Sequence, residues 1–199
     1  MADLLHENIR DYNVILASRS PRRQMLLKGL DIDFTVITHD FDESYPEGLD
    51  KNEIATYLAE KKSNAFAEEL KDPRTLLITA DTIVWLDGEV LNKPVDKGDC
   101  FRILKKLSGS THEVVTGVCL RTHDKKRVFH ANSFVHFKEL SDEELQYYIE
   151  KYHPYDKAGA YGVQEWIGYI GITHMAGSYF NVMGLPVHRL YEELAALIR

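Results

Sequence analysis

The stretch from Asn13 to Gly29 constrains the fold most, because its pattern changes from strand to helix across one tight turn. Residues 14–16 are a short apolar run of the kind that a buried strand shows, and apolar residues at helical spacing follow the turn. Ser20 is a favourable N-cap, Pro21 suits the first helical position, and Gly29 can end the helix as a left-handed residue. The sequence therefore predicts a strand, a turn and a helix in this order.

This turn predicts a binding site for an anion, which we interpret as a phosphate site. Free backbone N–H groups and the positive end of the helix dipole would lie beside Ser18, Ser20, Arg22 and Arg23. These side chains add donors that a bare helix end lacks. An ordinary helix cap with two solvated arginines explains the same residues, so the rest of the chain has to decide between the two interpretations.

The composition is typical of a soluble globular protein and disfavours several kinds of partner. Of the 199 residues, 44% are hydrophobic and 28% are charged, and the net charge is −7. An acidic chain is not expected to bind nucleic acid or an anionic membrane, so the basic residues of the turn would form a local field for a small anion. We therefore expect no nucleic-acid partner and no membrane partner.

The cysteines and the N-terminal residues indicate the compartment. Cys100 and Cys119 lack metal-type spacing and fall in predicted core positions, which favours reduced thiols. No signal peptide and no apolar run long enough to span a membrane is recognisable. These features predict a cytoplasmic protein.

The chain shows no internal repeat, low-complexity tract or interdomain linker. Residues 1–12 are expected to be an N-terminal extension with a helical turn through Leu4, Leu5 and Ile9. Residues 13–199 are expected to form a single domain.

Three carboxylates fall within four positions, at Asp40, Asp42 and Glu43, just after a strand predicted over 33–38. Such a run repels itself unless a cation lies nearby. A solvated loop is the ordinary interpretation. A divalent metal beside bound phosphates would reverse that preference, because hard oxygen ligands suit Mg²⁺.

A long amphipathic helix is predicted next, opened by a capping box of Asp50 and Glu53 and continuing to residue 66. Lys61 and Lys62 would lie near its middle, and we expect one of them to face the edge of the sheet. Lysines on helices are usually solvated, so this pattern alone does not indicate a ligand.

An apolar strand over 75–80 is predicted to end at Asp81 and Thr82. Ligands of α/β sheets gather at the carboxyl ends of strands, so Asp81 is a candidate functional carboxylate, with an ordinary turn aspartate as the alternative. A hairpin with an Asp-Gly turn follows and brings Lys93 back toward Asp81. An acid and a base are thus predicted to lie together.

The remaining segments predict a fold of the α/β or α+β class with a mixed, twisted sheet. Residues 111–122 and 127–138 are expected to pair as antiparallel strands across a polar turn. Further predicted elements are helices capped by Asp96 and Ser141, a glycine- and alanine-rich loop over 156–162, a strand over 169–175 and a terminal helix over 187–198.

Signatures of several other chemistries are absent from the sequence. It has no P-loop, no dinucleotide-binding glycine motif, no nucleophile elbow and no metalloprotease motif. The nine histidines are scattered, and no catalytic triad can be deduced from them. Catalysis by a nucleophilic side chain is therefore not predicted.

Taken together, the motifs resemble those of the Maf family, the septum formation inhibitor or Maf-like nucleoside triphosphate pyrophosphatases, over about residues 13–198. This resemblance implies an elongated α/β fold of the ITPase-like type with a central cleft. It also implies hydrolysis of a nucleoside triphosphate to the monophosphate and pyrophosphate with a divalent cation, Mg²⁺ or Mn²⁺. The matching motifs, in chain order, are Leu16-Ala17-Ser18-x-Ser20-Pro21-Arg22-Arg23, Asp42-Glu43, Leu58-Ala59-x-x-Lys62, Ala80-Asp81-Thr82, Lys93-Pro94, Ser108-Gly109, Asp156-Lys157-Ala158-Gly159-Ala160-Tyr161-Gly162-x-Gln164 and Gly184-Leu185-Pro186.

The resemblance also implies roles for individual residues. Asp81 is similar to the catalytic proton acceptor of the family, and whether it serves as base, metal ligand or both stays open. Glu43 and Asp81 would bind the metal. The implied phosphate-binding residues are Ser18, Ser20, Arg23, Lys62 and Lys93.

Specificity is implied by three positions, Arg22, Thr82 and Gln164, which resemble the branch that acts on dTTP and UTP. A glutamine amide can donate to O4 and accept from N3–H of uracil or thymine, and modified pyrimidine nucleotides fit the same pattern. Two departures from the family pattern, Arg19 and the pair Glu165-Trp166, are expected to alter the pocket and to leave the phosphate chemistry intact.

Two alternatives to this function stay open. One is the same chemistry on 7-methyl-GTP, against which the three specificity positions speak. The other is a regulator of septum formation and cell division that binds nucleotides without hydrolysing them. Whether the protein forms a homodimer is not decided by the sequence.

Overall fold

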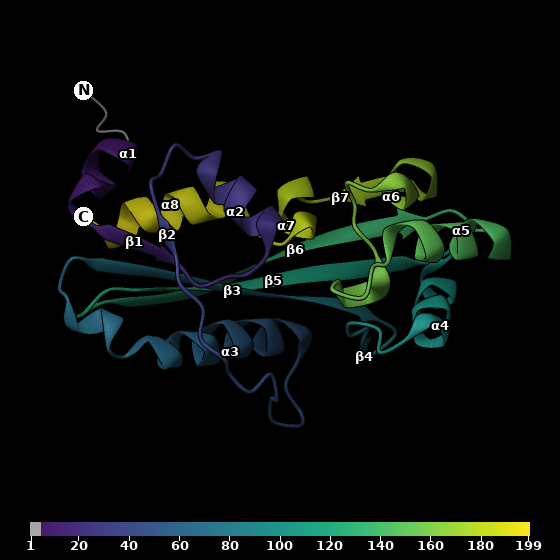
Figure 1. Ribbon diagram of the computed structural model, residues 1–199, viewed down its shortest axis with the longest axis horizontal. Coiled ribbons are helices and arrows are strands. Elements are labelled where there is room, and N and C mark those ends of the chain that lie inside the picture. The colour runs from purple at the N-terminus through teal and green to yellow at the C-terminus, as the bar shows by residue number, and fades with distance from the viewer. Residues whose placement is uncertain (1–4) are drawn as a thin grey trace. The chain divides into compact units, whose positions relative to one another are not determined.

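The computed structural model describes residues 5–199, apart from the side chain of His6 (Figure 1). Of the predicted N-terminal turn, Leu4 lies outside the described residues, whereas α1 (Leu5–Asn8) and the 3-10 helix η1 (Ile9–Asp11) are helical as expected. The chain forms two compact units. Unit 1 comprises residues 1–81, 116–131 and 184–199, and unit 2 comprises residues 82–115 and 132–183.

The sheet is mixed, with the strand order β2-β1-β3-β5-β6-β7 and β4 paired to β3. β1 runs parallel to both β2 and β3, whereas β4 and β7 are antiparallel to their neighbours. The predicted mixed α/β class with helices flanking a sheet is therefore confirmed. The strands are β1 (Asn13–Leu16), β2 (Thr35–Val36), β3 (Thr75–Leu86), β4 (Glu89–Val90), β5 (Thr111–Arg121), β6 (Lys126–Phe137) and β7 (Ile172–Ala176).

The helices begin at the caps that the sequence predicts. The side chain of Ser20 accepts from the backbone N–H of Arg23, and that of Asp96 accepts from the backbone N–H of Asp99. The capping boxes at Asp50 and Ser141 both form. No helix among residues 5–199 is long and apolar enough to cross a membrane. The helices are α2 (Pro21–Lys28), α3 (Lys51–Ser63), η2 (Asn64–Phe66), η3 (Glu69–Lys71), α4 (Lys97–Leu107), α5 (Asp142–Tyr152), η4 (Ala158–Ala160), α6 (Trp166–Gly171), α7 (Tyr179–Met183) and α8 (Val187–Leu197).

In unit 1, α3 covers one face of the sheet, and α2 and α8 lie on the other face (Figure 1). The backbone of α3 packs directly against β5, because a Cβ atom on Gly117 would lie 2.1 Å from the carbonyl oxygen of Ala55. The Thr79 hydroxyl of β3 donates to the carbonyl oxygen of Ala59 at 2.6 Å. These contacts fix α3 on the sheet and set the direction of the side chains in its last turn.

The predicted end of the third strand at Asp81 is wrong. The strand continues through Asp81 and Thr82 to Leu86, so the predicted strand and the first half of the hairpin are one element. The register explains the polar pair: β1 pairs with β3 only as far as Ile78, and β4 joins from Trp85 onward. Asp81 and Thr82 lie on the stretch of β3 between these two pairings, where polar side chains fit.

Four other predicted boundaries are wrong for local reasons. Gly29 ends α2 in the right-handed region with φ −67°, and the left-handed residue is Asp31, because backbone bonds to Leu27 and Lys28 prolong the turn. The strand predicted over 33–38 shortens to β2, since it pairs only with the end of β1.

The strand predicted over 169–175 begins three residues late, at Ile172. Tyr169 belongs to α6 instead, because the backbone N–H groups of Gly168 and Tyr169 both donate to the carbonyl oxygen of Glu165 and close a helical turn. The predicted long helix likewise ends at Ser63 and continues as η2, so Lys61 and Lys62 fall in its last turn.

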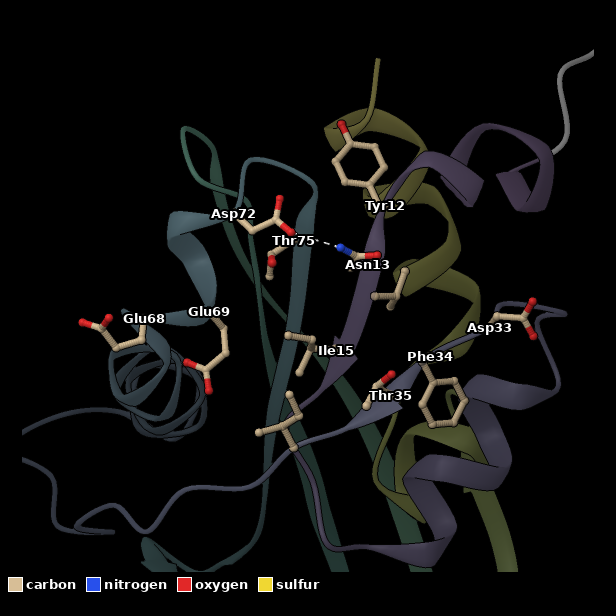
Figure 2. A pocket seen from close by; sticks show the side chains of 12 residues that line it. Tyr12, Asn13, Ile15, Asp33, Phe34, Thr35, Glu68, Glu69, Asp72 and Thr75 are labelled. Carbon is tan, nitrogen blue, oxygen red and sulfur yellow. Dashed lines mark hydrogen bonds between the residues drawn. The ribbon is translucent and has the colours of Figure 1, made fainter.

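Unit 1 also contains a pocket of about 590 Å³ at the amino ends of β1 and β3 (Figure 2). Its rim carries the carboxylates of Asp33, Glu68, Glu69 and Asp72, and Ile15 belongs to its apolar lining. Ligands of α/β sheets gather at the opposite, carboxyl ends of parallel strands. This pocket is therefore distinct from the place where the sequence predicts the phosphate site.

Candidate functional site

The turn between β1 and α2 is built by the two serines that the sequence singles out. Ser18 is 5% exposed, and its Oγ accepts from the backbone N–H of Ser20 at 3.2 Å. The Oγ of Ser20 accepts from the backbone N–H of Arg23 at 3.4 Å, and the Gln24 amide donates to the Ser18 carbonyl oxygen at 3.3 Å. Because each hydroxyl acts here as an acceptor, each keeps its own proton for donation to an anion.

Arg23 extends from the first turn of α2 and is anchored within unit 1. Its Nε donates to the carbonyl oxygen of Gly184 at 2.7 Å. Burial lowers the pKa of Arg23, and the carboxylates of Asp81 and Glu43 oppose that shift while Arg22 adds to it. A guanidinium stays protonated in proteins, so burial leaves a cation beside Asp81 that favours an anionic ligand.

Lys62 is the lysine of α3 that reaches the sheet, as predicted for one of the pair. Its Nζ lies 3.2 Å from the carbonyl oxygen of Ala80 and 3.5 Å from Oδ1 of Asp81, and the two side chains are only 14% and 19% exposed. The ring of Phe41 lies beneath the ammonium, with 4.5 Å between Nζ and the ring centroid. Burial lowers the pKa of Lys62, and the carboxylates of Asp81 and Glu43 oppose that shift without reversing it.

Four charged side chains of unit 1 are thus coupled: Arg23 and Lys62 as cations, Glu43 and Asp81 as anions. We call this set the charge cluster. The parallel strands β1 and β3 bring Arg23 and Asp81 together, since α2, which follows β1, carries Arg23 and β3 itself carries Asp81. Two half-buried cations beside a carboxylate can bind a polyanion and leave the carboxylate to accept a proton.

The acidic run resolves into three different environments. Asp40 pairs with Arg19 at 3.0 Å, and Asp42 pairs with Lys61 at 2.9 Å. Hydrogen bonds from Ser44 and Lys61 hold the pKa of Asp42 well below its usual range. The solvated-loop interpretation therefore holds for Asp40 and Asp42, whose repulsion is relieved by protein cations.

Glu43 alone in that run contributes to the charge cluster, which leaves two carboxylates, Glu43 and Asp81, for a metal. Among residues 5–199 no group of three or more His, Cys, Asp or Glu side chains is arranged to hold a metal ion. Two carboxylates nevertheless suit Mg²⁺, which is typically bound by one or two carboxylates together with water and substrate phosphates. The donor set therefore fits a divalent cation that binds together with a phosphate chain.

Three other predicted site residues, Thr82, Lys93 and Gln164, belong to unit 2. Thr82 is half-buried and follows Asp81 on β3, and Lys93 is exposed in the loop after β4. Gln164 lies in the turn before α6, and its Oε1 is buried without a hydrogen-bond partner among the described residues. The predicted proximity of Lys93 to Asp81 stays a prediction, because the two residues belong to different units.

The structure assigns contacts to the residues that depart from the family pattern and to residues that sequence reasoning missed. Arg19 belongs to the turn between β1 and α2, but its side chain pairs with Asp40 and is 73% exposed. Glu165 forms an ion pair with the buried side chain of Lys157, with 3.2 Å between Oε1 and Nζ. No role for Phe41 or Lys157 is predicted from the sequence, although an aromatic residue inside an acidic run and a lysine inside a glycine-rich loop are signals that it contains.

Comparison with known proteins supplies a family. The sequence matches the Maf-like proteins, the family named Maf, over residues 13–197. The dTTP/UTP pyrophosphatase of Parabacteroides distasonis is 52% identical over 189 residues, which cover 94% of this chain and 97% of that protein. The dTTP/UTP pyrophosphatase of Phocaeicola vulgatus is 55% identical over 192 residues, which cover 96% and 99%. The solved structure of the Staphylococcus aureus Ham1 protein aligns with a TM-score of 0.44 and 21% identity over 65% of this chain and 72% of that one.

Proposed function

The chain belongs to the Maf family, and on that premise we propose that it is a nucleoside triphosphate pyrophosphatase that hydrolyses dTTP and UTP. The products would be the nucleoside monophosphate and pyrophosphate. The observation that carries the proposal is the buried contact between Lys62 and Asp81, with the charge of Arg23 beside it. Relatives named dTTP/UTP pyrophosphatase at about half identity over nearly the whole chain support the choice of substrate.

The charge cluster suits attack of water on the α-phosphorus. A nucleoside triphosphate carries about four negative charges, and Arg23 and Lys62 would neutralise those on the phosphate chain while the Ser18 hydroxyl donates to it. Asp81 would take one proton from the attacking water as its oxygen bonds to phosphorus. The bond between the α-phosphorus and the bridging oxygen then breaks, and pyrophosphate leaves without a covalent enzyme intermediate.

We propose that Glu43 and Asp81 hold the divalent cation, Mg²⁺ or Mn²⁺. When bound, such an ion would supply further neutralisation of the phosphate charge and polarise a phosphoryl oxygen. The support is that both carboxylates interact with the same two cations, Arg23 and Lys62, and that carboxylate oxygens suit a hard divalent ion that would bind together with phosphates.

Base selection is proposed for Arg22, Thr82 and Gln164, with Gln164 as the direct reader. Its Oε1 is a buried acceptor without a partner among the described residues, and an unpaired buried acceptor is costly unless a ligand satisfies it. The N3–H of uracil or thymine could supply that hydrogen bond, while the amide N–H donates to O4. In the same amide orientation Oε1 would face the unprotonated N3 of cytosine and the amide N–H would face its amino group, so we expect discrimination against CTP.

We also propose a cytoplasmic location, with no nucleic-acid partner. Cys100 and Cys119 are both free and buried, and burial raises the pKa of the Cys100 thiol to about 11, which keeps it protonated and unreactive. The net charge of −7 disfavours a polyanionic partner larger than the nucleotide that the charge cluster can neutralise.

The proposal is tested by assaying the purified protein with Mg²⁺ or Mn²⁺ on dTTP, UTP, CTP, 7-methyl-GTP and ITP, with both products measured separately. Asp81→Asn should abolish turnover, whereas Asp72→Asn, the same change in the loop before β3, should not. Binding of UTP without any turnover by the wild type would instead favour the non-hydrolysing regulator. Turnover of 7-methyl-GTP in preference to UTP would overturn the assignment of substrate.

A further inference from the structure

The turn that carries Gln164 is held by a buried network inside unit 2. The Tyr148 hydroxyl of α5 donates to Oε2 of Glu165 and accepts from the backbone N–H of Gly162 at 3.0 Å. Lys157 lies 3.2 Å from Oε1 of Glu165 and also donates to Asp156 at 2.7 Å. We call Tyr148, Lys157 and Glu165 the Glu165 clamp.

The clamp is shielded from solvent, so its contacts are more than surface pairing. The side chain of Lys157 is 9% exposed and that of Glu165 is 19% exposed. Burial and the neighbouring Glu165 carboxylate raise the pKa of Tyr148, so its hydroxyl keeps its proton and donates it to Glu165. A buried carboxylate is costly to leave without partners, and the clamp supplies two of them.

The backbone on both sides of Gln164 is also confined by close packing. A Cβ atom on Gly162 would lie 2.7 Å from Cδ of Glu165, so the carboxyl group rests directly on that glycine. A Cβ atom on Gly168 would lie 2.0 Å from the carbonyl oxygen of Val163. The backbone N–H of Glu165 donates to Gly162 at 3.0 Å and closes the turn. Gln164 is therefore the one residue of this turn whose side-chain acceptor is buried yet unpaired, among the residues that the structure describes.

We propose that Glu165 is a positioning residue for base recognition, which acts by fixing the turn that presents Gln164. Glu165 orients the Tyr148 hydroxyl, the hydroxyl holds Gly162, and the closed turn leaves Gln164 a single direction. The inference rests on the proposed function, because it needs a pyrimidine base to be read. It adds to that function a reason why the amide is preorganised before the nucleotide binds.

The test compares Glu165→Gln and Tyr148→Phe with wild type in steady-state kinetics on UTP and CTP. Both variants should raise KM for UTP about tenfold, the scale on which a misplaced binding group acts, with kcat for UTP within about twofold. The ratio of kcat/KM between UTP and CTP should fall by a similar factor. Tyr147→Phe is the matched control, because Tyr147 is the adjacent residue of α5, is 43% exposed, and bonds through its hydroxyl to Lys151.

A clamp that only stabilised the fold would change KM for UTP and CTP equally, and an unchanged UTP/CTP ratio in both variants would overturn the inference. If a thermal melt shows that Glu165→Gln does not fold, Tyr148→Phe still tests the inference, because it keeps the aromatic ring and removes only the hydroxyl. Hydrogen exchange at the Gly162 amide gives a readout independent of activity: it should accelerate in both variants and not in Tyr147→Phe. Absence of UTP hydrolysis by the wild type would reject the proposed function, whereas normal hydrolysis with unchanged exchange and ratio would reject only the clamp.

Discussion

At the scale of single residues, the proposed chemistry depends on the two cations that interact with Asp81. Lys62 contacts the carboxylate at 3.5 Å, and Arg23, in the first turn of α2, interacts with it electrostatically. The neighbouring Lys61 carries the same charge but bonds to Asp42 and Ser44 on the acidic loop. Two adjacent lysines on one helix therefore have separate tasks, which makes them a matched pair for mutation.

Lys62→Met is expected to lower kcat/KM for UTP about 100- to 1,000-fold, the loss seen when one preorganised group that stabilises transition-state charge is removed. Methionine keeps most of the length and apolar stem of lysine, so the fold should survive. Lys61→Met should stay within about threefold of the wild type, because its contacts lie on an exposed loop. Equal losses in the two variants, measured by UMP release, would contradict the role given to Lys62.

The candidate site could be predicted at this scale only in part. The residue types, the serines of the turn and a lysine facing the sheet follow from local pattern, because caps and strand ends carry local signals. The division of the acidic run among Arg19, Lys61 and the charge cluster does not, since these contacts join residues 19 to 21 positions apart. The stacking of Phe41 on Lys62 is of the same long-range kind.

At the scale of elements, the site is positioned by the seating of α3 on the sheet. Gly117 lets the α3 backbone approach β5, and Thr79 bonds the helix to β3. Element types and caps are predictable from the sequence, but the course of β3 through Asp81 is not. The polar pair Asp81 and Thr82 is tolerated inside the strand because β1 ends opposite Ile78. That register depends on tertiary contacts and not on the local sequence.

Gly117→Ala should therefore displace α3 and with it Lys62. A methyl group 2.1 Å from a backbone oxygen cannot be accommodated by a side-chain rotation, so we expect a loss of about 2–3 kcal/mol in the free energy of unfolding and a fall in kcat. Gly98→Ala in α4 is the control, because the added Cβ would meet only the Asp96 side chain at 3.4 Å. That change should be neutral or slightly stabilising in urea unfolding. A Gly117→Ala protein with wild-type stability would show that α3 is not seated as described.

At the scale of the whole molecule, one buried histidine links stability to pH. His112 is 2% exposed, its Nε2 lies 2.7 Å from the Tyr161 hydroxyl, and burial lowers its pKa to about 3. The folded chain keeps this imidazole neutral, whereas the unfolded chain binds a proton below its ordinary pKa of about 6.5. The stabilising contribution is therefore complete above that value and is lost as the pH falls toward 3.

The free energy of unfolding should fall by up to about 1.4 kcal/mol for each pH unit below about 6.5 through this residue alone. In His112→Gln that slope should flatten, since glutamine does not titrate. His188→Gln, at an exposed position of α8, should keep the wild-type slope. Urea unfolding between about pH 4 and 7 measures all three, and identical slopes in wild type and His112→Gln would contradict the assignment.

The position of bond cleavage tests the proposed pyrophosphatase chemistry most directly. UTP is hydrolysed by the purified protein in water enriched in ¹⁸O, and the two products are separated and weighed by mass spectrometry. Attack at the α-phosphorus, beside Asp81, predicts that UMP carries one ¹⁸O atom and pyrophosphate carries none. Label in pyrophosphate, or release of UDP and orthophosphate, would contradict the role proposed for the charge cluster.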